Sequence, residues 1–90
     1  MAIHKKKTWP EIFERVLSGE KKFDFRVADF DIQNGDELIL EEWNPQTKEY
    51  TGRSISKKVG YVGTFSLDVF GQREAIEKHG MHIITLEDVE

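Results

Sequence analysis

Apolar residues recur at helical spacing in the first part of this chain. In residues 9–17 they fall three or four positions apart with charged residues between them, which predicts an amphipathic helix. Thr8 and Glu11 form a capping-box sequence around Pro10, so the helix is expected to begin there. Gly19 follows at the position where a left-handed backbone ends many helices.

After this glycine, apolar residues recur at every second position instead of at helical spacing. In residues 22–27, two phenylalanines and a valine alternate with Lys22, Asp24 and Arg26. Alternation predicts a half-buried strand, with an ammonium, a carboxylate and a guanidinium in a row on its polar side. Lysine and aspartate are uncommon in strands, which makes this row the first candidate for a functional surface.

Two further strands are predicted in the middle of the chain. Residues 37–43 carry inward-facing leucines, and residues 44–48 form a loop rich in turn formers. A long strand follows over residues 50–64. Three glycines within it predict bulges or a bend, which a small closed barrel needs at its corners.

The last quarter of the chain has a weaker pattern. Residues 66–71 show no assignable period, and residues 72–79 predict a short helix that ends at Gly80. Residues 81–86 predict a closing strand. Residues 87–90 are expected to form a frayed acidic tail.

Composition predicts one folded domain over residues 1–90. The chain is 38% hydrophobic and 33% charged, which is typical of a globular protein rather than a disordered one. It has no apolar run near the ~20 residues of a membrane span, and no signal peptide is expected. The absence of cysteine excludes disulfides and suits a reducing cytoplasm, where we expect the protein.

Charge is distributed unevenly along the chain, whose formal net charge is -4. Residues 1–26 hold seven Lys and Arg against four Asp and Glu, whereas the remaining 64 residues hold six against thirteen. A basic first third on an acidic chain fits a local site for an anion, with repulsion elsewhere limiting indiscriminate binding to nucleic acids. The alternative is that Lys5, Lys6 and Lys7 form a solvated edge.

Candidate chemistry centres on Lys21, Asp24 and Arg26, to which Arg53 and Lys7 are added as ligand-binding residues. Arginine binds phosphate or carboxylate with two parallel hydrogen bonds, and a desolvated lysine can act as a base. Aspartate can accept a hydrogen bond from a nucleobase amino group. Three aromatic residues are candidates for stacking on a base: Trp9, Trp43 and Tyr50.

Structural explanations compete with this interpretation. The charges of residues 22–26 can form cross-strand ion pairs, each contributing under about 1 kcal/mol, and the two tryptophans can belong to the core. The three histidines, at positions 4, 79 and 82, lack a ligand spacing, so we predict no metal site. No cofactor-binding motif is present, and no cofactor is expected.

Gly19, Lys21 and Arg26, with the acidic Asp24, resemble the signature of ASCH domains, a branch of the PUA-like superfamily. The wider sequence resembles a subgroup of small uncharacterised bacterial and phage relatives. The resemblance implies an α+β fold: a small, mostly antiparallel β-barrel with one N-terminal amphipathic helix packed on it, and a short second helix. It also implies a cleft beside the first helix that the signature residues line.

Three functions follow as hypotheses. The first is a module that binds RNA or a modified nucleoside in the cleft. The second is a nucleoside amidohydrolase or ribonuclease in which Lys21 and an acidic residue, Asp24, are catalytic. Amidohydrolases of the ASCH type carry threonine where this chain has Asp24, so the nucleophile of that reaction is missing here. The third is a protein-interaction module, encoded by a phage, with an unknown protein partner.

Overall fold

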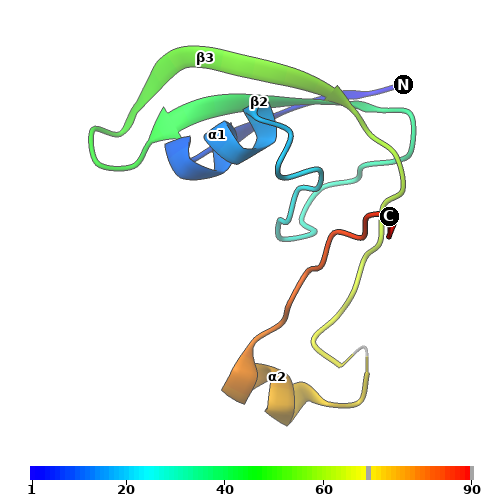
Figure 1. The fold of residues 1–90 in the computed structure, drawn as a ribbon. Coiled ribbons are helices and arrows are strands. Elements are labelled where there is room, and N and C mark those ends of the chain that lie inside the picture. Colours follow the sequence, from blue (N-terminus) through cyan, green and yellow to red (C-terminus); the bar gives the residue numbers. More distant parts are fainter. Residues whose placement is uncertain (69, 90) are drawn as a thin grey trace.

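The computed structural model of this chain describes residues 1–68 and 70–89. Within them, three strands form one sheet and two short helices lie outside it (Figure 1). In chain order the elements are β1 (Ile3–Thr8), α1 (Pro10–Leu17), β2 (Glu37–Asn44), β3 (Glu49–Lys58) and α2 (Arg73–His79). Neither helix has the length or the apolar composition needed to cross a membrane. The predicted tail ends in Glu90, which lies outside the described residues, as does Val69 within the unassigned residues 66–71.

β2 is the central strand of the sheet. β1 pairs with it in parallel, with Thr8 opposite Glu42, and β3 pairs with it antiparallel. Parallel neighbours need a long crossover connection. The chain between β1 and β2 therefore carries α1 and a loop of residues 18–36, here called the 18–36 loop. β2 and β3 are joined by the predicted hairpin loop, where the Asn44 side chain accepts a hydrogen bond from the Gln46 N–H at 2.8 Å.

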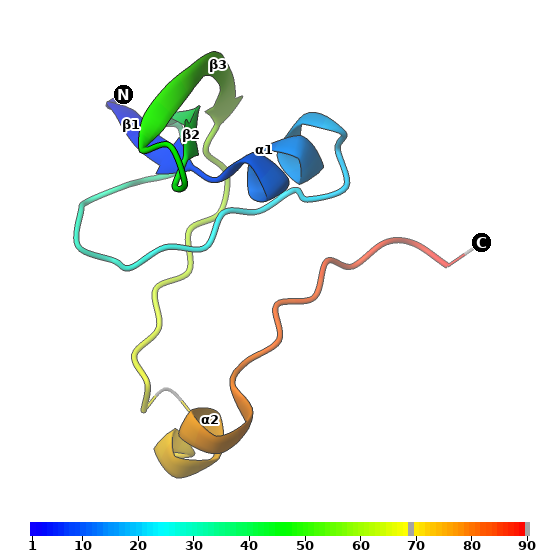
Figure 2. The same ribbon diagram turned by 90° about the vertical axis from the view of Figure 1, so that its left-hand side faces the viewer.

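The core lies between β2 and α1. Side chains alternate along β2, so Leu38 and Leu40 are buried on the side of the sheet where they pack with Val16 of α1. Phe13, almost one helical turn earlier, is also buried. Figures 1 and 2 show α1 on one side of the sheet and no helix on the other. Three partly buried residues extend the core cluster: Ile32, Ile55 and Val59.

Asp36 joins the start of the chain to the start of β2. Its carboxylate accepts hydrogen bonds of 3.0 Å from the backbone N–H groups of Ala2 and Gln33, and His4 Nε2 lies 3.0 Å from the same carboxylate. These hydrogen bonds, that of Ala2 above all, lower the pKa of Asp36 from 3.8 to about 2. The carboxylate thus fixes the register at which β1 meets β2.

The predicted closed barrel is wrong. The described residues form a three-stranded open sheet, which has free edges at β1 and β3. The long strand predicted over residues 50–64 is shorter and ends at Lys58. The predicted closing strand 81–86 has no regular structure and pairs with nothing, so the sheet stays open. What remains of the prediction is a small α+β fold.

Residues 22–27 do not form the predicted strand. They run without regular structure in the 18–36 loop, and Phe25 is 71% exposed, so their apolar side chains do not line a common core face. The parallel partner of β2 is instead β1. The sequence did not predict β1 because its three consecutive lysines show no alternation of apolar and polar residues. Alternation alone indicates a strand only when a neighbouring strand supplies hydrogen-bond partners.

The first helix is confirmed, but its start differs from the prediction. Thr8 ends β1 and is 3% exposed, so it is not the helix cap. Trp9 takes that position without a side-chain cap bond, and Pro10 opens the helix. Gly19 has a φ of 84°, the left-handed conformation expected after the helix. The second predicted helix, 72–79, is confirmed as α2, and Gly80 follows it with a φ of 73°.

Candidate functional site

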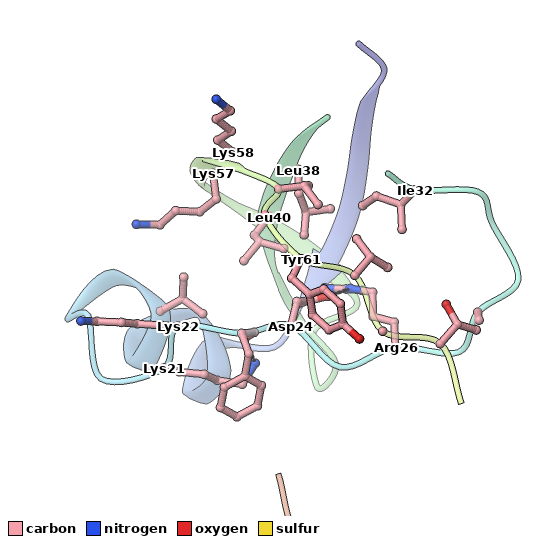
Figure 3. A pocket seen from close by; sticks show the side chains of 18 of the residues that line it. Lys21, Lys22, Asp24, Arg26, Ile32, Leu38, Leu40, Lys57, Lys58 and Tyr61 are labelled. Atoms are coloured by element: carbon pink, nitrogen blue, oxygen red, sulfur yellow. Dashed lines mark hydrogen bonds and ion pairs between the residues drawn. The ribbon is translucent and has the colours of Figure 1, made fainter. Parts of the chain in front are cut away.

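A pocket of about 600 Å³ lies between the 18–36 loop and the chain that follows β3 (Figure 3). At its base lie the core side chains of Val16, Leu38 and Leu40, which are themselves buried. One wall comes from residues 19–32, and the other from residues 57–64. Ligand sites commonly have an apolar floor with a few polar groups at the rim, and volumes of about 300–1,000 Å³.

Positive charge dominates the lining of this pocket, which we call the lysine-rimmed pocket. Two acidic side chains, Asp24 and Asp31, also line it. Lys22 and Lys57 extend to the same side, away from Arg26, and Lys58 points in a different direction (Figure 3). The cationic lining residues are Lys21, Lys22, Arg26, Lys57 and Lys58. With five cations against two carboxylates, the described lining favours an anionic ligand although the whole chain is acidic.

Lys21 is held in place by its own loop. Its Nζ donates a hydrogen bond of 2.7 Å to the Phe23 carbonyl and lies 4.5 Å from the centroid of the Phe23 ring. Partial burial lowers the pKa of Lys21; the nearby Asp24 carboxylate opposes this shift, and the Arg26 guanidinium adds to it. The ammonium is therefore positioned in the pocket and less costly to deprotonate than a free lysine.

Arg26 uses its donors within the protein. Its guanidinium forms an ion pair with Asp24 and turns towards the sheet (Figure 3). Nη1 donates to the Lys7 carbonyl and Nη2 to the Thr8 hydroxyl, both at 3.0 Å. Arg26 thus fixes the 18–36 loop to the end of β1. Lys21, Asp24 and Arg26 all belong to the pocket wall.

Arg53 and Lys7, also predicted as ligand-binding residues, do not line this pocket. Arg53 binds the buried carboxylate of Glu42 and pairs with Glu14 of α1. These carboxylates raise the pKa of Arg53, and its hydrogen bonds lower that of Glu42. Lys7 lies on the opposite face of the sheet, with Nζ 4.5 Å from the centroid of the Trp43 ring.

Sequence reasoning missed the contribution of the chain after β3. Lys57 and Lys58 end β3, and Tyr61 follows three residues after Lys58. Their signal was a lysine pair followed by Gly60 and an aromatic residue, but only the topology brings this pair beside the 18–36 loop. The aromatic side chains that line the pocket are Phe23, Phe30 and Tyr61, rather than the predicted Trp9, Trp43 and Tyr50.

Metal ligation finds little support in the geometry. Across residues 1–68 and 70–89, no three His, Asp or Glu side chains lie close enough together to hold a metal ion. His4 is engaged by Asp36 at 3.0 Å, and its ring lies 5.6 Å, centroid to centroid, from that of Phe30. This histidine therefore serves the contact between β1 and β2.

Comparisons with known proteins find a matching family and a phage relative. A family described as a domain of unknown function (DUF3850) matches residues 3–74. An uncharacterised 12.9 kDa protein in the GpA 3′ region of Escherichia phage P2 is 37% identical over 64 residues. That match covers 71% of this chain and 57% of the phage protein, so the chain spans little more than half of its relative. No solved structure matches at a significant level.

Proposed function

We propose that this chain, which belongs to the DUF3850 family, is a binding module that holds one unit of an RNA segment, or a modified nucleoside, in its lysine-rimmed pocket. The observation that carries the proposal is the pocket lining. Apolar side chains, aromatic rings and an excess of cations surround one cavity. The resemblance of Gly19, Lys21 and Arg26 to the ASCH signature supports the same class of ligand.

The size and the aromatic lining of the pocket suit a nucleobase. A volume of about 600 Å³ falls in the range of small-molecule sites. Tyr61 is 88% exposed at the wall, so its ring is accessible for stacking. Stacking of a base on an aromatic side chain contributes about 1–3 kcal/mol and tolerates different bases.

The cations suit the phosphate or another anionic part of such a ligand. Lys57 and Lys58 form no ion pair among the described residues, and neither does Lys22. The ammonium groups of Lys22 and Lys57 are thus available to a ligand, unlike the guanidinium of Arg26, whereas Lys58 extends away from the other lining residues (Figure 3). The net charge of -4 on the whole chain opposes binding of nucleic acid elsewhere on the surface. A cysteine-free sequence supports a reducing compartment, and we expect the module to act in the cytoplasm.

Removing two pocket cations tests the proposal. Lys21→Ala/Lys57→Ala should weaken binding of a short fluorescent single-stranded RNA, measured by anisotropy over a series of salt concentrations. Each lost phosphate contact should make the slope of log K against log salt less steep by about 0.7 to 0.9. Unlabelled nucleosides and nucleoside monophosphates, added as competitors, distinguish a free nucleoside ligand from an RNA segment.

The matched control is Lys5→Ala/Lys48→Ala, which removes the same charge from residues outside the pocket lining. It should bind RNA nearly as the parent chain does. Equal affinities and equal salt slopes for the two double variants would show that the pocket is not the binding site.

The lowered pKa of Lys21 favours a second candidate function, hydrolysis of an amide or a phosphodiester in the same pocket. Lys21 would act as the base that accepts a proton from the attacking water, or from the 2′-hydroxyl of RNA, and a protonated pocket carboxylate, Asp24 or Asp31, would protonate the leaving group. Incubation with acetylated cytidine and with labelled RNA tests this function. Turnover that disappears in Lys21→Ala supports it, and the absence of turnover with both substrates rejects it.

A further inference from the structure

Large apolar side chains gather, uncovered, in residues 81–89, here called the C-terminal segment. All nine residues are exposed, and Ile84 and Leu86 are 72% and 87% exposed. α2, which precedes the segment, has no buried residue either. Exposed apolar side chains on this scale mark a surface that binds something. The other large apolar side chains of the segment are Met81, Ile83 and Val89.

The same part of the chain carries the net negative charge. Residues 1–64 contain eleven basic and eleven acidic residues, whereas residues 65–90 contain two basic and six acidic residues. In the C-terminal segment, Glu87 and Asp88 follow the apolar residues directly, and no lysine or arginine is present. The segment thus combines apolar side chains with negative charge, the complement of the pocket's exposed apolar wall residues, Val27 and Tyr61, and its lysines.

The path of the chain brings the segment back towards the sheet. After β3 the chain leaves the sheet, α2 reverses its direction, and the C-terminal segment returns towards the level of α1 without packing on it (Figures 1 and 2). Residues 65–80 link the pocket wall to the segment. With seven of these sixteen residues in α2, the link can span about 40 Å, comparable with the 41 Å longest dimension of the chain.

We propose that the C-terminal segment docks in the lysine-rimmed pocket of its own chain. Ile83, Ile84 and Leu86 would pack against the exposed apolar side chains of the pocket walls, Val27 and Tyr61, and the acidic pair that follows would face Lys57. A tethered segment has an effective concentration in the millimolar range, which favours its own pocket over that of a second copy. Docking would exclude the ligand from the pocket and so regulate its binding. This regulatory consequence rests on the proposed function, whereas the docking itself does not.

The cysteine-free sequence allows a direct test. Tyr61→Cys/Ile84→Cys places one thiol on the pocket wall and one in the C-terminal segment. Under mild oxidation at low protein concentration, a disulfide should form within single chains, seen by mass spectrometry and a non-reducing gel. The control Tyr50→Cys/Ile84→Cys carries its first thiol on an exposed residue outside the pocket lining and should form far less. Equal yields from the two pairs, or a cross-linked dimer, would overturn docking within one chain.

RNA affinity tests the regulatory consequence. Ile83→Ser/Ile84→Ser should raise the affinity for the short RNA by about threefold or more, because apparent affinity is reduced by the fraction of closed molecules. The control Leu67→Ser/Phe70→Ser removes two exposed apolar side chains outside the segment and should leave affinity unchanged. An intramolecular cross-link with unchanged affinity would overturn the regulatory role. If neither the parent chain nor any variant binds RNA, the proposed function is rejected. The cross-linking result alone then decides whether the segment docks.

Discussion

Arg53 holds the carboxylate of Glu42 with two hydrogen bonds of 2.9 Å, from Nε and Nη2. Glu42 is 4% exposed, so without this partner its charge would be buried and uncompensated. The Thr51 hydroxyl donates to the same carboxylate, and Arg53 also pairs with Glu14. One guanidinium therefore connects β3 to β2 and to α1, on the face of the sheet that carries the core.

Arg53→Ala should lower the melting temperature by roughly 5 °C or more, because it leaves the buried carboxylate of Glu42 without its ion pair. Arg73, whose ion pairs with Asp68 and Glu77 are exposed, provides the control. Arg73→Ala should change stability by no more than about 0.5 kcal/mol. Differential scanning fluorimetry measures the melting temperatures of the two variants, and chemical unfolding measures their free energies of unfolding. Equal destabilisation by the two substitutions would contradict the role assigned to Arg53.

Acid should destabilise the protein through Asp36. Its folded-state pKa of about 2 lies below the ordinary 3.8, so its contribution is complete above about pH 4 and is lost as the pH falls from there towards 2. Asp36→Asn lacks this titration. In urea unfolding, the parent should be more stable than the variant at pH 7, and the difference should shrink between pH 4 and 2. A constant difference over this range would refute the assignment.

Gly19→Ala should cost roughly 1–2 kcal/mol, because alanine is strained at a φ of 84° although nothing lies within 4 Å of the added Cβ. Gly60→Ala is the matched control. Its Cβ also meets open space, but its backbone has no positive φ. Urea unfolding of both variants separates backbone strain from packing, and a Gly19 variant as stable as the Gly60 variant would exclude the strain.

Arg26→Lys should loosen the 18–36 loop, because lysine cannot contact Asp24, the Lys7 carbonyl and the Thr8 hydroxyl at the same time. Backbone amide order parameters from NMR relaxation should fall in residues 22–30, and RNA affinity should fall as the pocket wall moves. Arg15→Lys changes an exposed pair with Glu20 and serves as control. Order parameters in residues 22–30 equal to those of the parent would show that Arg26 does not hold the loop in place.

Local sequence determined the elements whose interactions are local. The apolar spacing of residues 9–17 and Gly19 predicted α1, and the turn formers of residues 44–48 predicted the hairpin between β2 and β3. Helix hydrogen bonds and tight turns join residues a few positions apart, so the information they need lies within one window of sequence. The sequence likewise singled out Lys21, whose place follows directly from the end of α1.

Tertiary structure decided what depends on distant partners. β1 forms because β2, about thirty residues away, supplies its hydrogen bonds, whereas residues 22–27 alternate as a strand does but find no partner. The lysines at the end of β3 reach the pocket only because the antiparallel pairing returns the chain to the 18–36 loop. Strand pairing joins residues far apart in the chain, and a period of two in one segment does not specify which other segment will complete it.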